Sequence, residues 1–120
     1  MTFESTAARD VYVLGDAIQV APAMPKSGHM ANNHAKVAAA AIVAQLSGWA
    51  VNATPVLTNT CYSFVDDKNV VHVASVHEYV AAEKTFKTVT GSGGLSPGPT
   101  ELEGAYANNW ARNIWADTLG

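Results

Sequence analysis

Asp16 is the first residue whose position could serve chemistry. It follows the apolar run in "VYVLGDA" (residues 11–17), which is typical of a buried strand that ends at Gly15 and Asp16. A carboxylate just beyond the carboxyl end of a buried strand can accept hydrogen bonds from the hydroxyl groups of a ligand. An aspartate in this place can equally well form a turn or cap a helix, and the run alone does not separate the two alternatives.

The residues after this turn favour the ligand interpretation. Lys26 precedes Ser27, the expected N-cap of a long helix that starts at Gly28. A lysine beside the N–H groups of a helix N-terminus attracts an anionic or electron-rich group. Together with Asp16, these residues predict the edge of a ligand site.

The histidines and the glycine-rich segment carry weaker signals. His29 and His34 are well over a right angle apart around a helix, and His72 and His77 lie on opposite faces of a strand, so neither pair predicts a metal site. The segment "GSGGLSPG" (residues 91–98) leads into proline rather than into a helix. It therefore lacks the context of a phosphate-binding loop, and we expect a surface loop.

Cys61 and Trp110 are ambiguous when they are considered alone. Cys61 is the single cysteine, which excludes an internal disulfide and a cysteine-rich metal site. An isolated cysteine is usually a small buried hydrophobic residue. By its spacing, Trp110 is a core aromatic residue of a helix.

An alanine-rich helix and an antiparallel sheet are the elements that would position these residues. The helix is expected to begin after Ser27 and to end before Gly48, a favourable C-terminal residue. Two β-rich runs flank the turn-forming residues 66–69, which predicts a hairpin, and "KTFKTVT" (residues 84–90) predicts a third strand. The sequence therefore indicates an α+β fold.

A second helix is expected to close the chain. Thr100 and Glu103 have the spacing of a capping box. Aromatic and aliphatic residues follow at helical spacing, which predicts an amphipathic C-terminal helix. These residues are Tyr106, Trp110, Ile114 and Trp115.

Composition excludes several classes of function. The chain has 120 residues, 48% of them hydrophobic, and a formal net charge of -3. It is long enough for one folded domain, and the absence of any lysine or arginine cluster argues against binding to nucleic acid. The apolar stretch from Val37 to Leu46 is shorter than the roughly 20 residues that a membrane span needs. No targeting segment is visible.

Several motifs taken together resemble one flavoenzyme family. The order "TFES", "VYVLGDA", "MPKSGHMANNHAKVAAAAIVAQLSG", "NTCYS" and "NIWADTLG" is similar to the C-terminal portion of the flavoprotein subunit of flavocytochrome c sulfide dehydrogenase. The likeness spans nearly the whole chain and is weakest over residues 65–98. More distantly, the chain resembles sulfide:quinone reductases and the pyridine-nucleotide-disulfide reductase class.

The resemblance implies roles for particular residues. Gly15 and Asp16 would contact the ribityl chain of FAD, and the segment that holds Lys26, Ser27, Gly28 and Asn32 would bring a helix N-terminus to the pyrimidine end of the flavin ring. Cys61, in "NTCYS", matches one of two redox-active cysteines, and Trp110 matches a tryptophan near the flavin. These two residues would form the catalytic part of the site.

The resemblance also implies how the chain is organised and where it works. Residues 1–49 would return to an FAD-binding domain and residues 50–120 would cover the flavin. The glycine-rich FAD motif, the partner cysteine and a nucleotide-type domain would lie upstream, so Met1 would be an artificial start or the start of a truncated reading frame. Sulfide would be the substrate and a c-type cytochrome the partner, in the periplasm.

Two alternatives remain at this point. The chain could be an interaction module that retains the fold without catalysis, or part of a quinone-linked or NADH-linked flavin oxidoreductase of the same superfamily. In either case a piece without its FAD domain would expose apolar surface, for which we expect self-association. Catalysis by the isolated chain is not expected.

Overall fold

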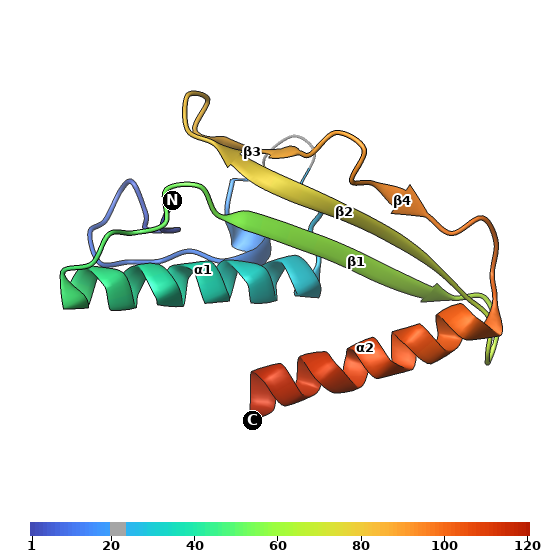
Figure 1. Cartoon of the computed structure of the whole chain (residues 1–120). Helices are drawn as coiled ribbons and strands as arrows, with labels where there is room; N and C mark the ends of the chain where they lie inside the picture. Colours follow the sequence, from blue (N-terminus) through green and yellow to red (C-terminus); the bar gives the residue numbers. More distant parts are fainter. Residues whose placement is uncertain (20–23) are drawn as a thin grey trace.

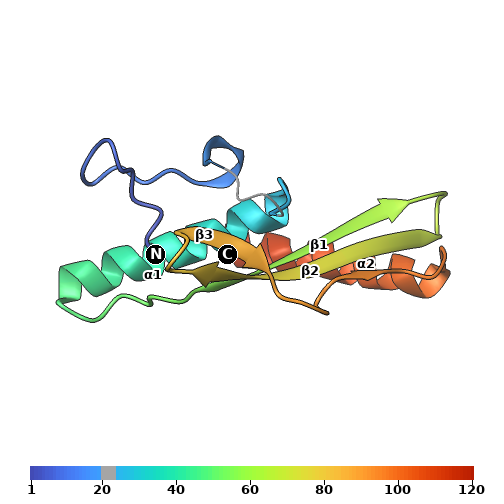
Figure 2. The same cartoon turned by 90° about the horizontal axis from the view of Figure 1, so that it is seen from above.

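One long hairpin organises the fold, and the computed structural model describes residues 1–19 and 24–120 around it. The α+β class predicted from the sequence is confirmed. Figure 1 shows the sheet with two helices below it, and Figure 2 shows the same elements from above. The elements in chain order are η1 (Gly15–Ala17), α1 (Gly28–Ser47), β1 (Val56–Phe64), β2 (Val70–Val80), β3 (Thr85–Thr88), β4 (Gly94–Leu95) and α2 (Glu101–Leu119).

Both ends of α1 are set by the expected residues. The hydroxyl of Ser27 accepts a hydrogen bond from the Met30 N–H at 3.0 Å, and Gly48 adopts the left-handed conformation with φ of 69°. A side-chain cap and a C-terminal glycine satisfy backbone groups that a helix end leaves unpaired. The predicted helix boundaries are therefore confirmed. The loop before α1 falls partly on residues 20–23, which lie outside the described residues.

The predicted hairpin and third strand are also confirmed. β1 pairs with β2 in antiparallel register, with Cys61 opposite Val73, and β3 pairs with the other side of β2. The Asp66 carboxylate accepts hydrogen bonds from the N–H groups of Lys68 and Asn69, which closes the turn between the long strands. Local turn chemistry therefore explains why the chain reverses here.

The glycine-rich segment is more regular than the expected surface loop. Its residues Gly94 and Leu95 form β4, which pairs with β2. Two serine hydroxyls extend the contact, since the Ser96 hydroxyl accepts from the His72 N–H and the Ser92 hydroxyl accepts from the Val76 N–H. Side-chain hydroxyls thus bind backbone groups of β2 where the segment forms no continuous ladder.

The strand expected before Asp16 is wrong. Residues 11–14 form no strand, and Tyr12 makes only an isolated bridge to Glu4. Gly15 begins the short helix η1 instead. An apolar run becomes a strand only when a neighbouring strand accepts its hydrogen bonds, and within the described residues Glu4 is its only bridge partner.

The core lies between α1, the N-terminal residues and one end of the sheet. Leu57 is fully buried, and Phe3, Met24, Met30 and Phe86 pack around it with Ala38. The small alanine side chain lets the helix approach the other elements closely. This core fixes α1 against β1.

α2 has the expected position in the sequence, and two of the four expected residues, Trp110 and Ile114, are half-buried on its inner face. Gly104 and Ala107 are buried, whereas Tyr106 and Trp115 are 51% and 62% exposed. The smallest residues face the sheet because the helix starts directly against β2, with Val70 exchanging backbone hydrogen bonds with Thr100. In the described part of the chain, neither helix is long and apolar enough to cross a membrane.

Gly104 should tolerate no larger side chain. An added Cβ would collide with the backbone oxygen of Lys68. We expect Gly104→Ala to destabilise the fold by about 1–3 kcal/mol, because overpacking outweighs the roughly 1 kcal/mol that alanine gains in a helix. Chemical denaturation measures the difference. Gly28→Ala, where a Cβ meets nothing within 4 Å, is the matched control and should be neutral or stabilising.

Two buried histidines should make the fold sensitive to acid. Burial lowers the pKa of His34, against an opposing effect of Asp16, and burial lowers the pKa of His77. The unfolded chain binds protons with the ordinary histidine pKa of about 6.5, before the folded chain does, so stability falls as the pH drops below about 6.5. Urea denaturation from pH 8 to pH 5 tests this. His77→Gln should flatten the profile, and an equally steep profile in that variant would contradict the assignment.

Candidate functional site

Side chains of α1 close the open edge of β1. The Asn33 side chain accepts from the Thr58 N–H and donates to the Thr58 carbonyl, and His29 Nδ1 accepts from the Thr60 N–H at 3.0 Å. Four helical residues rise about 6 Å, and two strand residues span about 6.6 Å, so the two spacings match. The helix thereby supplies partners that a neighbouring strand would otherwise provide.

A pocket opens where this closure ends. Its volume is about 560 Å³, and it lies between the N-terminus of α1, the far half of β1 and the second half of α2. The His72 N–H is used by Ser96, so its opposite residue, Tyr62, directs its own N–H away from β2. Tyr62 and Phe64 therefore line the pocket with the uncovered edge of β1.

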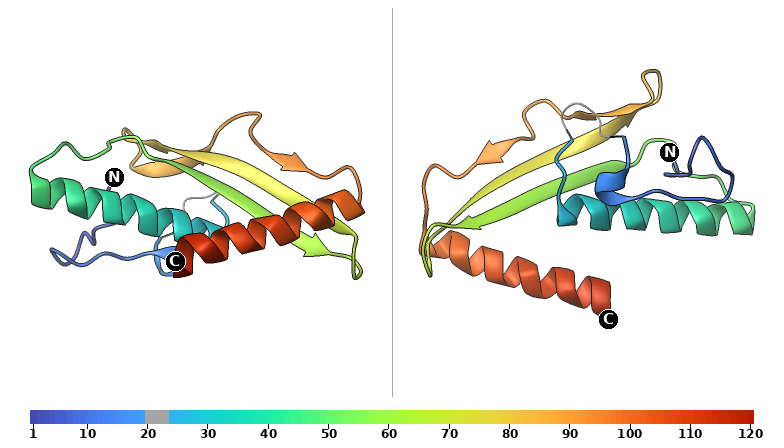
Figure 3. Two further views of the ribbon diagram at one scale, coloured as in Figure 1. Left: turned by 60° about the horizontal axis from the view of Figure 1, so that its bottom comes forward. Right: turned by 180° about the vertical axis from the view of Figure 1, so that it is seen from behind.

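Four of the predicted site residues meet in this pocket. Ser27 and Gly28 reach it from the start of α1, Cys61 from β1 and Trp110 from α2. The views in Figures 1 and 3 show how the C-terminal half of α2 approaches the N-terminal half of α1. Residues from three distant parts of the sequence thus share one cavity.

The remaining predicted residues lie beside the pocket rather than in it. The side chain of Asp16 is exposed, and the Lys26 ammonium donates to the Asp16 backbone oxygen at 3.4 Å. Gly15 has φ of 63° and donates its N–H to His34. The predicted proximity of Asp16, Lys26 and the start of α1 is therefore present.

Asn32 connects the two helices. Its side-chain amide donates to the Asp117 carboxylate and to the Thr118 hydroxyl, both at 3.3 Å. Lys36 forms an ion pair with Asp117 at 2.8 Å, which lowers the pKa of that carboxyl. Asn32 thereby holds one wall of the pocket, because Thr118 lines it.

An aromatic cluster forms another part of the pocket wall. The His29 ring meets Trp110 edge-on with 5.4 Å between centroids, and Tyr62 lies 5.8 Å from Trp110. Burial lowers the pKa of His29, with Lys36 adding to the effect, so the imidazole is neutral near pH 7. Burial raises the pKa of Tyr62, so its phenol keeps its proton.

A chain of polar contacts through Asn59 connects the thiol of Cys61 with Ser27 at the start of α1. The amide nitrogen of Asn59 lies 3.5 Å from Cys61 Sγ, and its amide oxygen accepts from the Ser27 hydroxyl at 2.5 Å. Asn59 is only 3% exposed. A buried amide that forms hydrogen bonds through both its oxygen and its nitrogen is held in a defined orientation.

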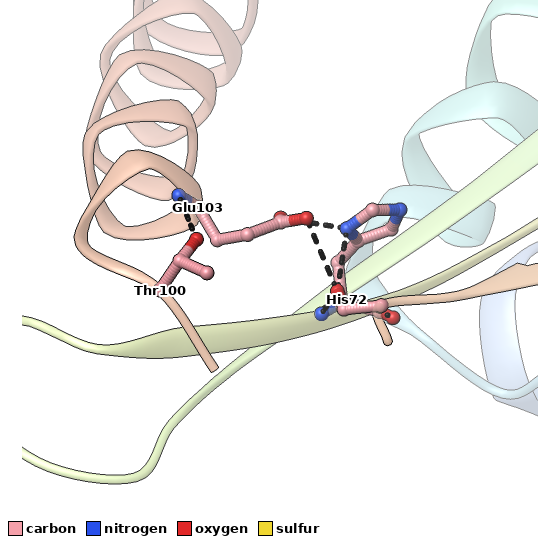
Figure 4. A network of polar contacts seen from close by, with 4 residues as sticks. His72, Thr100 and Glu103 are labelled. Atoms are coloured by element: carbon pink, nitrogen blue, oxygen red, sulfur yellow. Dashed lines mark hydrogen bonds and ion pairs between the residues drawn. The ribbon is translucent and has the colours of Figure 1, made fainter. Parts of the chain in front are cut away.

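A second polar network fixes the first turn of α2 next to this region (Figure 4). The Glu103 carboxylate lies 2.6 Å from His72 Nδ1 and accepts from the Ser96 hydroxyl at 3.2 Å. Only half of the predicted capping box is present: the Thr100 hydroxyl accepts from the Glu103 N–H, but the Glu103 side chain reaches β2 instead of returning to Thr100. The helix is thereby anchored to the sheet.

Sequence reasoning missed three residues of the site. His29 was considered only as a metal ligand, Tyr62 only as a strand residue, and Asn59 only as part of the motif "NTCYS", with no role of its own. The spacing of His29 and Asn33 on one helical face carried a signal, but it points to β1 only once the register of α1 against β1 is known. The aromatic cluster has no local signal.

The comparison with known families identifies the chain. Residues 53–119, more than half of the chain, match the family model described as "Flavocytochrome c sulphide dehydrogenase, flavin-binding". This family consists of flavoproteins, and its name implies a cytochrome c partner. The chain belongs to the flavin-binding family of flavocytochrome c sulphide dehydrogenase.

The donors around the pocket fit a flavin. The Met30 N–H donates to the Ser27 hydroxyl and the Ala31 N–H to the Ser27 carbonyl, so the first amides of α1, at Gly28 and His29, have no hydrogen-bond partner among the described residues. Both residues line the pocket, and a Cβ at Gly28 would meet nothing within 4 Å. Free N–H groups at a helix N-terminus suit the oxygen-rich and nitrogen-rich edge of a reduced flavin ring.

The edge closure by Asn33 should be measurable. We expect Asn33→Ala to destabilise the fold by about 1 kcal/mol, because both backbone groups of Thr58 lose their partner at a partly solvated edge. Denaturant titration gives the value. Asn108→Ala on α2 is the control, since its amide donates to the carbonyl of Gly104 within the same helix. Equal effects of the two substitutions would argue against a specific role for the edge contact.

Proposed function

We propose that this chain is the C-terminal part of an FAD-dependent sulfide dehydrogenase of its family, which oxidises sulfide to sulfur and passes electrons through FAD to a c-type cytochrome. The observation that carries the proposal is the meeting of Cys61, Trp110, Ser27 and Gly28 in one pocket beside the uncovered edge of β1. Membership of the flavin-binding family supports FAD as the cofactor.

The residues of this chain would hold the flavin and shape its surroundings. The amides of Gly28 and His29 would donate to the pyrimidine edge of the ring, and Trp110 would pack beside it. Asp16, with its exposed carboxylate, would accept from the ribityl hydroxyls, while Lys26 keeps the loop close through the Asp16 carbonyl. The flavin supplies a two-electron acceptor when bound.

Cys61 would take part in the transfer of sulfur from the substrate. Oxidation of HS⁻ yields a sulfur atom, a proton and two electrons. In thiol–disulfide exchange, HS⁻ attacks a sulfur of the disulfide between Cys61 and a partner cysteine from the upstream part of the protein. A new S–S bond would form and the old one would break, which leaves a persulfide and a thiolate. When these two sulfurs join again in a bridge that keeps the added sulfur atom, one proton is released and two electrons would pass to FAD. The partner cysteine belongs to the proposal, because Cys61 is the only cysteine in this sequence.

The proposal includes the surroundings of the chain. The upstream FAD and nucleotide-type domains would cover the exposed apolar residues of α1 and the following turn, where Val43, Leu46 and Trp49 are between 52% and 85% exposed. Without those domains the same surface would favour self-association. A periplasmic location belongs to the same proposal and rests on the family resemblance.

Two other functions compete with this one. A non-catalytic interaction domain would keep the fold without using Cys61. A quinone-linked or NADH-linked oxidoreductase of the superfamily would use the flavin with another electron partner. The pocket around Cys61 favours the sulfide dehydrogenase over the interaction domain, and the match to the flavocytochrome c family favours it over the other oxidoreductases.

Flavin binding can be tested on the chain itself. We expect titration of FAD to quench its fluorescence and perturb its absorbance in a saturable way, with affinity weakened about tenfold in Asp16→Ala because a hydrogen bond to a charged acceptor is lost. Asp67→Ala, which removes an exposed carboxylate from the hairpin turn, is the matched control and should bind like the parent. Equal weakening in both variants would contradict the role of Asp16.

The function of Cys61 needs the longer protein that the proposal implies. We expect Cys61→Ser in that protein to abolish sulfide-dependent reduction of cytochrome c, since serine cannot take part in sulfur exchange, while FAD stays bound. Reduction of cytochrome c in a stopped-flow experiment is the measurement. Activity near that of the parent would refute the sulfide mechanism and favour one of the competing functions.

A further inference from the structure

Asn59 occupies a buried position between the start of α1 and the thiol of Cys61. Its oxygen is 2.5 Å from the Ser27 hydroxyl, its nitrogen is 3.5 Å from Cys61 Sγ, and the sulfur lies 3.8 Å from the oxygen. The side chain is 3% exposed, so water does not compete for these contacts. The orientation of the amide therefore decides whether the sulfur faces mainly a donor or an acceptor.

The contacts of Ser27 determine this orientation. The Ser27 hydroxyl accepts from the Met30 N–H as the N-cap of α1, and its own proton is donated to the Asn59 oxygen. A separation of 2.5 Å falls in the range of O–H···O bonds and below the range of N–H···O bonds. A flipped amide would also leave the Ser27 proton without this acceptor. Hence the amide nitrogen of Asn59 faces the sulfur.

We propose that Asn59 is a positioning residue that directs a fixed N–H donor at the sulfur of Cys61 and so favours the reactive thiolate. The inference deepens the proposed function and rests on it, because it concerns the cysteine that would exchange sulfur there. A thiolate, not a thiol, is the nucleophile in sulfur exchange, and a donated hydrogen bond stabilises its charge. The N-cap of α1 thereby also sets the reactivity of a residue on β1.

The surroundings of Cys61 allow a clean measurement. The other titratable groups that line the pocket are His29 from α1 and Tyr62 from β1, and the lining residues of α2 carry no charge. The pKa of His29 is lowered and that of Tyr62 is raised, so both stay neutral between about pH 7 and pH 9. A change of reactivity across this window reports on Cys61.

The test is the rate of alkylation by iodoacetamide, a neutral reagent, from pH 6.5 to pH 10. The chain has one cysteine, so the modified residue is unambiguous. We expect Asn59→Asp to slow alkylation at pH 7 by about tenfold or more, because a carboxylate replaces the donor with a negative charge. The rate at the high-pH plateau should remain within about twofold, since access to the sulfur is unchanged.

Asn52→Asp provides the matched control. It introduces the same charge at an exposed position, where the oxygen that accepts from the Thr54 N–H is retained. We expect its alkylation profile to follow the parent. An Asn59→Asp profile that coincides with the parent, or a rate that falls equally at every pH, would overturn the assignment, because the second result indicates reduced access instead of a lost donor.

Ser27→Ala keeps the proposal testable if Asn59→Asp does not fold. Removal of the hydroxyl frees the amide to flip, so we expect a smaller slowing at pH 7, about threefold, with the same plateau. An unchanged rate would overturn the proposal. The assay uses neither flavin nor sulfide. Normal FAD binding together with unchanged alkylation would therefore refute the role of Asn59 but not the proposed function. Slowed alkylation together with no FAD binding would support the effect of Asn59 on the sulfur and count against the proposed function.

Discussion

The contact between α1 and the open edge of β1 is the interaction on which the rest of the structure depends. A strand edge exposes backbone N–H and C=O groups that lack hydrogen-bond partners. Here a helix supplies these partners through an imidazole and an amide, four residues apart. This arrangement fixes the distance and direction of α1 relative to the sheet. It also places the N-terminus of the helix beside the middle of β1, where the strand carries Asn59 and Cys61.

The pocket follows from a difference in length. α1 begins opposite Thr60, but β1 continues to Phe64, so the last part of the strand edge is left uncovered. α2 returns from the far end of the hairpin and closes this space with Trp110. The cavity thus combines helix amides, strand amides, a thiol and aromatic rings, which is a mixture that neither helix nor sheet would present alone. This mixture of groups is consistent with membership of a flavoprotein family.

Local sequence signals predicted much of the fold, whereas features that depend on contacts between distant residues could not be predicted. Ser27, Gly48 and the Asp66 turn act on neighbours within a few residues, so their effects are readable in the sequence. The run before Asp16 failed as a strand because strand formation depends on a distant partner. β4 was missed because serine hydroxyls replace part of its ladder. In the site, the roles proposed for Cys61 and Trp110 rest on the family resemblance, whereas His29, Asn59 and Tyr62 can be recognised as neighbours only when α1, β1 and α2 are brought together.

β2 pairs with every other strand of the described sheet and also carries the residues that anchor α2. During synthesis, therefore, residues 1–69 can form helix α1 but no strand pair of this sheet. The core around Leu57 stays incomplete until β3, which carries Phe86, has also emerged from the ribosome. The order of elements along the chain thus delays cooperative folding of this sheet until β2 and β3 have been synthesised. Until then the edge of β1 and the apolar side of α1 remain accessible, which makes this interval the one in which the nascent chain most needs protection from other chains.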